Sequence, residues 1–293
     1  MTKHFLVALS VTVVTMPWSA AAQQAPAGNP NATLFERLRT EQRNVELQKI
    51  APFKVFDDFY YVGVGFVGAW LINTGDGLIL IDSLQEPYVD HLIDDVKTLG
   101  FDPKNIKYVI VTHSHLDHYG GAKRIQEAYG AKVAMIEGDW KALEDTAATN
   151  RSAAFVPRKD VVFKDGDTFT LGKTSMKFYA TPGHTPGGLS IEQTVYDNGK
   201  PYKAFTIGGV TPTNQPGAAE GFITAIDRIS TIQGIQVNLP NHPWRGDVLE
   251  RGAKLTARKP GDPHPFVDPD AFYKLLKDLR AEAVEIIAKR ATK

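Results

Sequence analysis

The stretch Thr112-His113-Ser114-His115-Leu116-Asp117-His118-Tyr119-Gly120-Gly121 decides the fold of this chain. It carries three histidines and one aspartate within six positions, directly after an apolar run. In an extended chain, residues two apart project to the same side, so His113 and His115 can approach one cation, and Asp117 continues that side. A helical zinc motif spaces its histidines four residues apart. The spacing here therefore predicts a loop between a strand and a helix, with His118 turned toward a neighbouring cation.

Two further histidines complete the candidate metal site. His184 lies in the segment 181–188, T-P-G-H-T-P-G-G, and His242 lies in the segment 239–243, L-P-N-H-P. Each segment follows an expected strand, where an α/β fold gathers its functional loops. The chain has no cysteine, so imidazole nitrogen and carboxylate oxygen are the zinc ligands that remain. The other three histidines are expected to take no part in the site: His4, His91 and His264.

The motif H-x-H-x-D-H, the segment T-P-G-H-T-P-G and a late histidine together resemble the metallo-β-lactamase superfamily from about Pro52 to the C-terminus. Within it, the chain is most similar to the third subclass of class B (zinc) β-lactamases. Three features carry this likeness: an Asp-His pair without a cysteine ligand, D-F-Y-Y-V-G at 58–63 and P-F-V-D-P at 265–269. The resemblance implies two zinc ions, with His113, His115 and His184 on the first and Asp117, His118 and His242 on the second. For Asp82 it implies hydrogen bonds that support the metal loop; the alternative is an ordinary polar residue at a strand end.

Strands and helices alternate through the rest of the chain. Strands are expected at 59–62, 69–72, 78–81, 108–112, 132–136, 160–163, 168–171, 175–180, 189–196 and 204–207. Helices are expected at 33–48, 87–99, 120–129, 139–145, 220–233 and 268–289. The strands at 160–163, 168–171 and 175–180 are expected to be antiparallel neighbours. Two strand-rich halves edged by amphipathic helices predict an α/β (α+β) fold, a four-layer αββα sandwich of the metallo-β-lactamase type.

The N-terminus predicts export. Residues 1–22 have a short polar start, an apolar stretch too short to span a bilayer comfortably, and small residues at 20–22, as in a cleaved signal peptide. The alternative is an uncleaved anchor. Residues 23–51 are expected to form an N-terminal leader segment and residues 52–293 a single domain. The protein would be periplasmic or secreted, and the lack of cysteine suits an oxidising compartment.

The predicted chemistry is metal-assisted hydrolysis. Two zinc ions that share a water can lower its pKa toward about 7, and the chain has neither a thiol nor a G-x-S-x-G motif. The resemblance implies an exported dinuclear zinc hydrolase that opens the amide bond of β-lactam antibiotics by attack of a metal-bound hydroxide. Asp117 is the candidate catalytic residue, because its carboxylate could orient that hydroxide. A formal net charge of zero and the lack of a basic stripe give nucleic-acid binding no electrostatic support, and no protein partner is implied.

The strand end at 205–210 departs from the relatives. Glyoxalase II, the lactonases and the flavodiiron proteins place a bridging aspartate there, whereas this chain has Gly208 and Gly209. Third-subclass β-lactamases usually show aspartate-serine, and here Thr211 and Thr213 are the candidates for contacting the substrate anion. A Gly209→Ser change is expected to leave metal binding intact and to alter the KM for β-lactams. Two alternatives stay open: a related zinc hydrolase of another lactone, ester or amide with weak or no β-lactamase activity, and a non-catalytic binding protein.

Overall fold

The computed structural model describes residues 32–147 and 151–292. The expected signal peptide at 1–22 and the first part of the leader segment lie outside them. Among the helices within these ranges, none is both long and apolar enough to cross a membrane.

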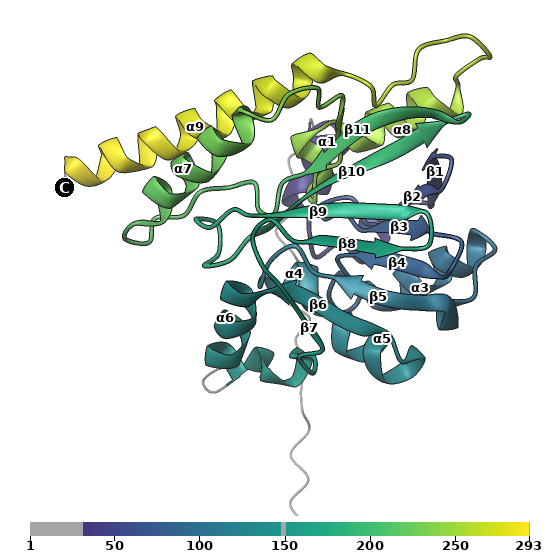
Figure 1. The fold of residues 1–293 in the computed structure, drawn as a ribbon, viewed down its shortest axis with the longest axis horizontal. Coiled ribbons are helices and arrows are strands. Elements are labelled where there is room, and N and C mark those ends of the chain that lie inside the picture. Colours follow the sequence, from purple (N-terminus) through teal and green to yellow (C-terminus); the bar gives the residue numbers. More distant parts are fainter. Residues whose placement is uncertain (1–31, 148–150, 293) are drawn as a thin grey trace, which may run out of the picture.

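The described residues form two β-sheets that lie face to face (Figure 1). The first sheet runs in chain order through β1 (Phe53–Phe56), β2 (Phe59–Tyr61), β3 (Trp70–Asn73), β4 (Leu78–Ile81), β5 (Ile106–Ile110), β6 (Lys132–Ile136) and β7 (Val161–Phe163). The second has the order β12 (Val237–Asn238), β11 (Lys200–Thr206), β10 (Leu189–Asp197), β9 (Thr174–Ala180) and β8 (Thr168–Leu171). In the first sheet, β4 is antiparallel to β3 on one side and parallel to β5 on the other.

Helices cover both outer faces of the paired sheets (Figure 1). On the first sheet these are α3 (Val89–Thr98), α5 (Ala122–Tyr129) and α6 (Glu137–Ala147). On the second sheet they are α7 (Ala218–Ser230) and α9 (Pro269–Ala291). Shorter helices lie in the connections: α1 (Leu34–Thr40), α2 (Val45–Gln48), α4 (Leu116–Tyr119) and α8 (Val248–Thr256). The 3₁₀ turns are η1 (Pro103–Asn105), η2 (Arg151–Phe155) and η3 (Pro243–Arg245).

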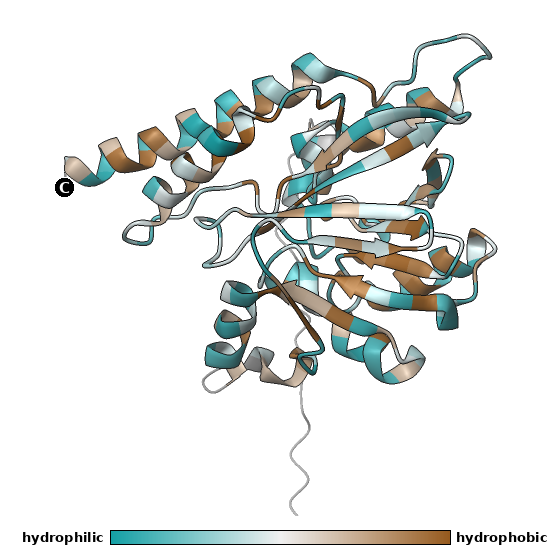
Figure 2. Ribbon diagram, viewed as in Figure 1, coloured by the Kyte–Doolittle hydropathy of each residue, from teal (hydrophilic) through white to brown (hydrophobic). Residues whose placement is uncertain are grey.

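Each interface between layers is an apolar core. In β4, Leu78 and Leu80 pack with the helices, whereas Ile79 and Ile81 pack with the second sheet. This alternation follows from the two-residue period of a strand, and because both faces are buried, the strand reads as a continuous apolar run. Figure 2 shows brown central strands, and helices in which teal and brown alternate. The predicted four-layer αββα sandwich is confirmed.

Two of the expected elements are wrong in detail. Strand β7 pairs in parallel with β6, with Ala134 opposite Val161, and is not an antiparallel neighbour of 168–171. The connection from β6 passes through α6, and parallel strands need such a crossover. The helix expected over 33–48 is broken after Thr40, because Asn44 accepts a hydrogen bond from the Leu47 amide and caps a second helix.

The histidines that were expected to stay outside the site have structural roles where they are described. Nε2 of His264 lies 2.9 Å from the Val55 carbonyl, and its ring stacks on Phe56 at 4.2 Å between centroids. Nε2 of His91 lies 3.1 Å from the Ile50 carbonyl. Both rings therefore hold segments of the fold together. His4 lies outside the described residues.

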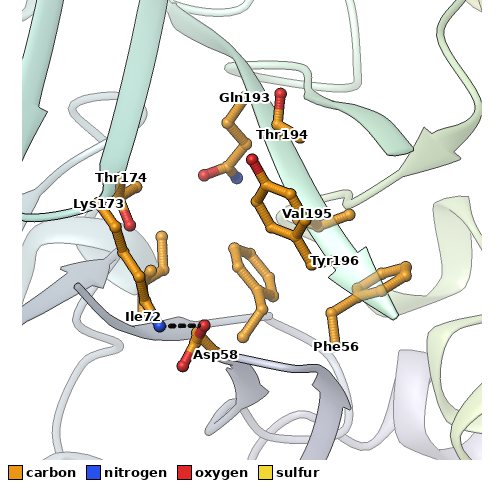
Figure 3. A pocket seen from close by; sticks show the side chains of 10 residues that line it. Phe56, Asp58, Ile72, Lys173, Thr174, Gln193, Thr194, Val195 and Tyr196 are labelled. Atoms are coloured by element: carbon orange, nitrogen blue, oxygen red, sulfur yellow. Dashed lines mark ion pairs between the residues drawn. The ribbon is translucent and has the colours of Figure 1, made fainter. Parts of the chain in front are cut away.

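A small cavity of about 40 Å³ lies between the sheets, at the end of β10 remote from Leu189 (Figure 3). Asp58 and Lys173 form an ion pair of 2.5 Å in its wall. The rest of its lining is apolar or uncharged: Phe56, Phe59, Ile72, Thr174, Gln193, Thr194, Val195 and Tyr196. Its single carboxylate is already paired, so this cavity offers no metal-ligand set.

Candidate metal centre

The loop after β5 carries four of the six candidate ligands. Its backbone is still extended at His115 (φ −86°, ψ 145°), and the next residues form the single turn of α4. His115 thus projects from extended backbone at the end of a bend over residues 112–115, whereas Asp117 and His118 project from a helix. The expectation that Asp117 continues the extended side is wrong, because the His118 amide donates to the His115 carbonyl at 3.0 Å and closes the turn.

His113, His115 and His184 form the first cluster. Each offers one ring nitrogen, and these nitrogens lie within 4.8 Å of one another. The ring centroid of His184 is 4.6 Å from that of His113 and 4.5 Å from that of His115. His184 follows β9, so the second sheet supplies this side chain while the first sheet supplies the other two.

Asp117, His118 and His242 form the second cluster, whose ligand atoms also lie within 4.8 Å of one another. Nε2 of His118 lies 3.3 Å from Nε2 of His242 and 3.4 Å from a carboxylate oxygen of Asp117. His242 follows β12, so this cluster too draws on both sheets. The rings of His113 and His118 are 3.9 Å apart between centroids, which places the two clusters side by side.

Carboxylate or backbone carbonyl oxygens accept hydrogen bonds from the far nitrogen of three of these rings, and the Thr112 hydroxyl lies 3.1 Å from Nδ1 of His113. Nδ1 donates to Asp82 at 2.8 Å in His118, to the Phe66 carbonyl at 2.8 Å in His242 and to the Thr211 carbonyl at 2.5 Å in His184. Each ring is thereby left with Nε2 as its ligand atom. Outer partners of this kind fix the tautomer and the orientation of histidines in metal sites.

Asp82 connects the start of the metal loop to its helical turn. It is 1% exposed and lies in the left-handed region, with φ 60°. Besides His118, its carboxylate accepts from the amide of Thr112 at 2.7 Å and from the hydroxyl of Thr112 at 2.9 Å. One buried side chain therefore positions both the residue before His113 and the ring of His118.

Buried nitrogens without a partner indicate that a metal fits here. Nε2 of His113 and Nε2 of His184 are buried and have no hydrogen-bond partner among the described residues. An unpaired buried polar atom costs about 1–3 kcal/mol, and a divalent cation would satisfy both. Burial lowers the pKa of His184 to about 3 and that of His242 to about 4. Both rings are therefore neutral, as metal ligands must be.

Asp117 and His118 form a charged pair in the metal-free protein. Burial opposes ionisation of Asp117, but the adjacent His118 outweighs it and holds the pKa of Asp117 well below its usual value. Burial likewise opposes the charge of His118, but Asp117 and Asp82 raise the pKa of that ring to about 10. Metal binding at the second cluster must therefore displace a proton from His118.

Asp139 supports the first cluster and was not predicted from the sequence. Its fully buried carboxylate accepts from the Ser114 hydroxyl at 2.7 Å and from the Gly188 amide at 2.7 Å. It therefore connects the loop of His113 and His115 to the loop of His184. Its position just beyond β6 was a usable signal, because side chains that follow neighbouring parallel strands meet at one sheet edge.

Replacing Asp139 with alanine should loosen the first cluster. The Gly188 amide would be buried without an acceptor, at a cost of about 1–3 kcal/mol, and we expect zinc affinity to fall about 10–100-fold. Chelator competition measures the affinity, and urea unfolding of the metal-free protein measures the stability. Asp139→Asn is the matched control, since its amide can accept from Gly188 and donate to Ser114. Equal zinc affinity in the wild type and the alanine variant would contradict this role.

The glycines of the loop after β11 are fixed by steric contacts. A Cβ on Gly208 would lie 2.3 Å from the Leu189 carbonyl oxygen. Gly209 has φ 116°, and a Cβ there would lie 2.6–2.8 Å from three carbon atoms of His184. These contacts argue against the expectation that Gly209→Ser leaves metal binding intact, because the loop packs directly on a candidate ligand.

Gly209→Ser should instead displace His184. We expect the first cluster to lose about tenfold or more in zinc affinity, in line with the loss of a ligand-orienting contact. Gly209→Ala is the matched control: if it weakens zinc binding as much as serine does, the added Cβ is the cause. Undiminished zinc affinity in both variants would show that the loop can move away.

The two threonines of this loop lie in different places. Thr211 provides the backbone carbonyl that holds His184, and its side chain is not in the cleft beside the first cluster. Thr213 does line that cleft, of about 560 Å³, together with His115 and His184. The Thr213 hydroxyl donates to the Gly183 carbonyl at 3.2 Å. Of the two, Thr213 is therefore the one placed to meet a ligand in this cleft.

Comparison with known proteins agrees with this architecture. Residues 62–197 match the family model of the metallo-beta-lactamase superfamily. The fold is similar to that of BJP-1, a subclass B3 metallo-beta-lactamase of Bradyrhizobium japonicum, with a TM-score of 0.76 and 30% identity over 84% of this chain and 96% of that one. It is also similar to the FEZ-1 metallo-beta-lactamase of Legionella gormanii, with a TM-score of 0.76 and 26% identity over 84% and 98%.

Curated sequences give shorter matches. A hydroxyacylglutathione hydrolase of Acidiphilium cryptum is 30% identical over 122 residues, which is 42% of each chain. A probable metallo-hydrolase of Bacillus subtilis is 28% identical over 129 residues, which is 41% of this chain and 54% of that one. The matched part thus spans about half the length of these curated relatives or less.

Proposed function

Because the chain belongs to the metallo-β-lactamase superfamily of hydrolases, we propose that it is a dinuclear zinc enzyme that opens the amide bond of β-lactam antibiotics. The observation that carries the proposal is the pair of adjoining ligand clusters, with buried Nε2 atoms that have no partner among the described residues. The similarity to a subclass B3 enzyme over 96% of its length supports a lactam as the substrate.

Each cluster would hold one zinc ion: His113, His115 and His184 the first, and Asp117, His118 and His242 the second. Zinc would supply Lewis acidity, which activates water at neutral pH and polarises a carbonyl oxygen. Asp117 keeps its carboxylate ionised, so that it can accept a hydrogen bond from the attacking water and orient it. The outer hydrogen bonds of His118, His184 and His242 hold the rings in place before substrate arrives.

We also propose that residues 1–22 direct export and are removed, so that the mature enzyme acts in the periplasm or outside the cell. Sequencing the N-terminus of the protein isolated from its host would give a start near Gln23.

A thioester hydrolase is the second candidate, favoured by the match to a hydroxyacylglutathione hydrolase over 42% of this chain. Gly208 and Gly209 stand where such enzymes are expected to carry an acidic metal ligand. Glycine has no side chain to supply one, and the space around both glycines is filled. We therefore place β-lactams first.

Metal removal separates these candidates. With EDTA, hydrolysis of the cephalosporin nitrocefin should fall to background, and zinc should restore it, because no thiol or serine motif replaces the metal. Parallel assays with lactones and acyl-glutathione thioesters should show no hydrolysis above background. Thioester turnover that responds to zinc while nitrocefin turnover stays absent would favour the second candidate.

A further inference from the structure

A groove of about 860 Å³ opens beside the metal centre, between α9 and the segment that follows His242. Its lining includes residues next to both clusters. Thr211 lines it and holds His184 through its carbonyl, and the ring of Trp244, also in the lining, lies 5.8 Å from that of His242. This volume is in the range of small-molecule sites, about 300–1,000 Å³. The groove is therefore well placed to take the part of a substrate remote from the scissile bond.

One basic side chain in the groove lining is not held in an ion pair with any described residue. Three of the basic side chains in its lining are in ion pairs: Arg245 with Glu282 at 2.6 Å, Arg251 with Asp268 at 3.0 Å and Lys274 with Asp278 at 2.6 Å. Arg39 of α1 also lines the groove, and it forms no ion pair with any residue in the described ranges. The exposed carboxylate of Asp247 lies in the same lining without an ion pair in these ranges.

Trp244 gives Arg39 a fixed platform. The guanidinium carbon of Arg39 lies 4.4 Å from the centroid of the indole, and that of Arg245 lies 4.5 Å from it. Arg245 is itself held by two hydrogen bonds to Glu282, at 2.6 and 2.7 Å. A guanidinium that stacks on an aromatic face keeps its N–H groups free for a carboxylate.

We propose that Arg39 and Trp244 select substrates whose remote side group carries both a planar ring and a carboxylate. The ring would pack in the groove beside the indole, and the carboxylate would pair with Arg39. This inference rests on the proposed hydrolase function for its kinetic test. The binding itself is independent of hydrolysis, because neither residue belongs to the ligand clusters.

The kinetic test uses two penicillins that differ by one carboxylate on the side chain, carboxybenzylpenicillin and benzylpenicillin. Arg39→Gln should reduce the preference for the first, the ratio of the two kcat/KM values, about fivefold, as for the loss of one exposed ion pair of about 1 kcal/mol. The change should appear in KM. Asp247→Asn should raise the same preference by removing the opposing charge. Arg43→Gln, which removes the same charge from an exposed residue outside the groove lining, is the matched control and should leave it unchanged.

A binding test remains valid even if the protein hydrolyses no β-lactam. Phenylmalonate and phenylacetate carry the same ring and differ by one carboxylate. Titrated into the zinc-free full-length protein, phenylmalonate should bind about fivefold more tightly by tryptophan fluorescence. That difference should vanish in Arg39→Gln. All titrations use a Trp18→Phe background, so the signal should vanish when Trp244→Phe is added, since the remaining Trp70 and Trp140 are 0% and 1% exposed. Equal binding of both acids to the wild type, or an unchanged difference in Arg39→Gln, would overturn the proposal.

Discussion

Replacing His113 with alanine is expected to lower kcat/KM about 1,000-fold or more, because the first cluster loses its most buried ligand candidate. His113 is 0% exposed, and its Nε2 has no hydrogen-bond partner among the described residues. Another described side chain would therefore have to move to replace it as a metal ligand. The loss should appear in kcat as well as in KM, since a missing metal removes stabilisation that acts in the transition state. Steady-state kinetics at saturating zinc, with zinc content measured in parallel, check this result.

Two further variants, His242→Ala and His91→Ala, serve as comparisons for that measurement. His242→Ala should retain the zinc of the first cluster and weaken the second, because His242 belongs to the second cluster alone. His91→Ala removes a ring that contacts Ile50 and Asp95 away from both clusters, and its zinc content should equal that of the wild type. A His113→Ala variant with full zinc content and activity would refute the proposed ligand set.

Replacing Asp82 with alanine is expected to give the largest loss of stability. The amide and hydroxyl of Thr112 and Nδ1 of His118 would all be buried without this acceptor. At about 1–3 kcal/mol for each unpaired group, the expected cost is about 4 kcal/mol or more. Alanine at φ 60° adds about 1–2 kcal/mol of backbone strain. Urea unfolding in the presence of EDTA measures this loss without the contribution of bound metal.

Asp82→Asn separates the carboxylate from the backbone conformation. Asparagine tolerates the left-handed region, so the strain is absent. Its amide has one oxygen acceptor in place of two, so about half of the hydrogen-bond loss should remain. An alanine variant as stable as the asparagine variant would mean that the loop rearranges to satisfy Thr112 and His118 by other groups.

Much of the site could be predicted from the sequence because its ligand candidates follow strands that are easy to recognise. The apolar run of β5 and the alternating run of β9 place His113 and His184 at strand ends, and the sandwich brings those ends together. The six candidate side chains accordingly fall into two clusters. The coarse layers follow from the same patterns, since the apolar faces of strands and helices can be buried only against one another.

Contacts between distant segments could not be predicted. The sequence of strand β7 does not show which sheet it joins, because an apolar triplet could be buried in either sheet. The position of Asp139 after β6 can be read from the sequence, but its contact with the Gly188 amide forms only when the fold brings the two segments together. The approach of Gly209 to His184 is likewise invisible in a linear sequence, because it depends on how two loops cross.

Because each ligand cluster takes side chains from both sheets, coordinated ions would join the two halves of the sandwich by bonds stronger than apolar packing. Unfolding that separates the sheets must then release metal, so resistance to denaturation would rise with the free zinc concentration around the protein. The stability of the folded protein would then depend partly on the supply of zinc in its surroundings. Zinc depletion would thus lower the stability of the folded protein as well as abolish its activity.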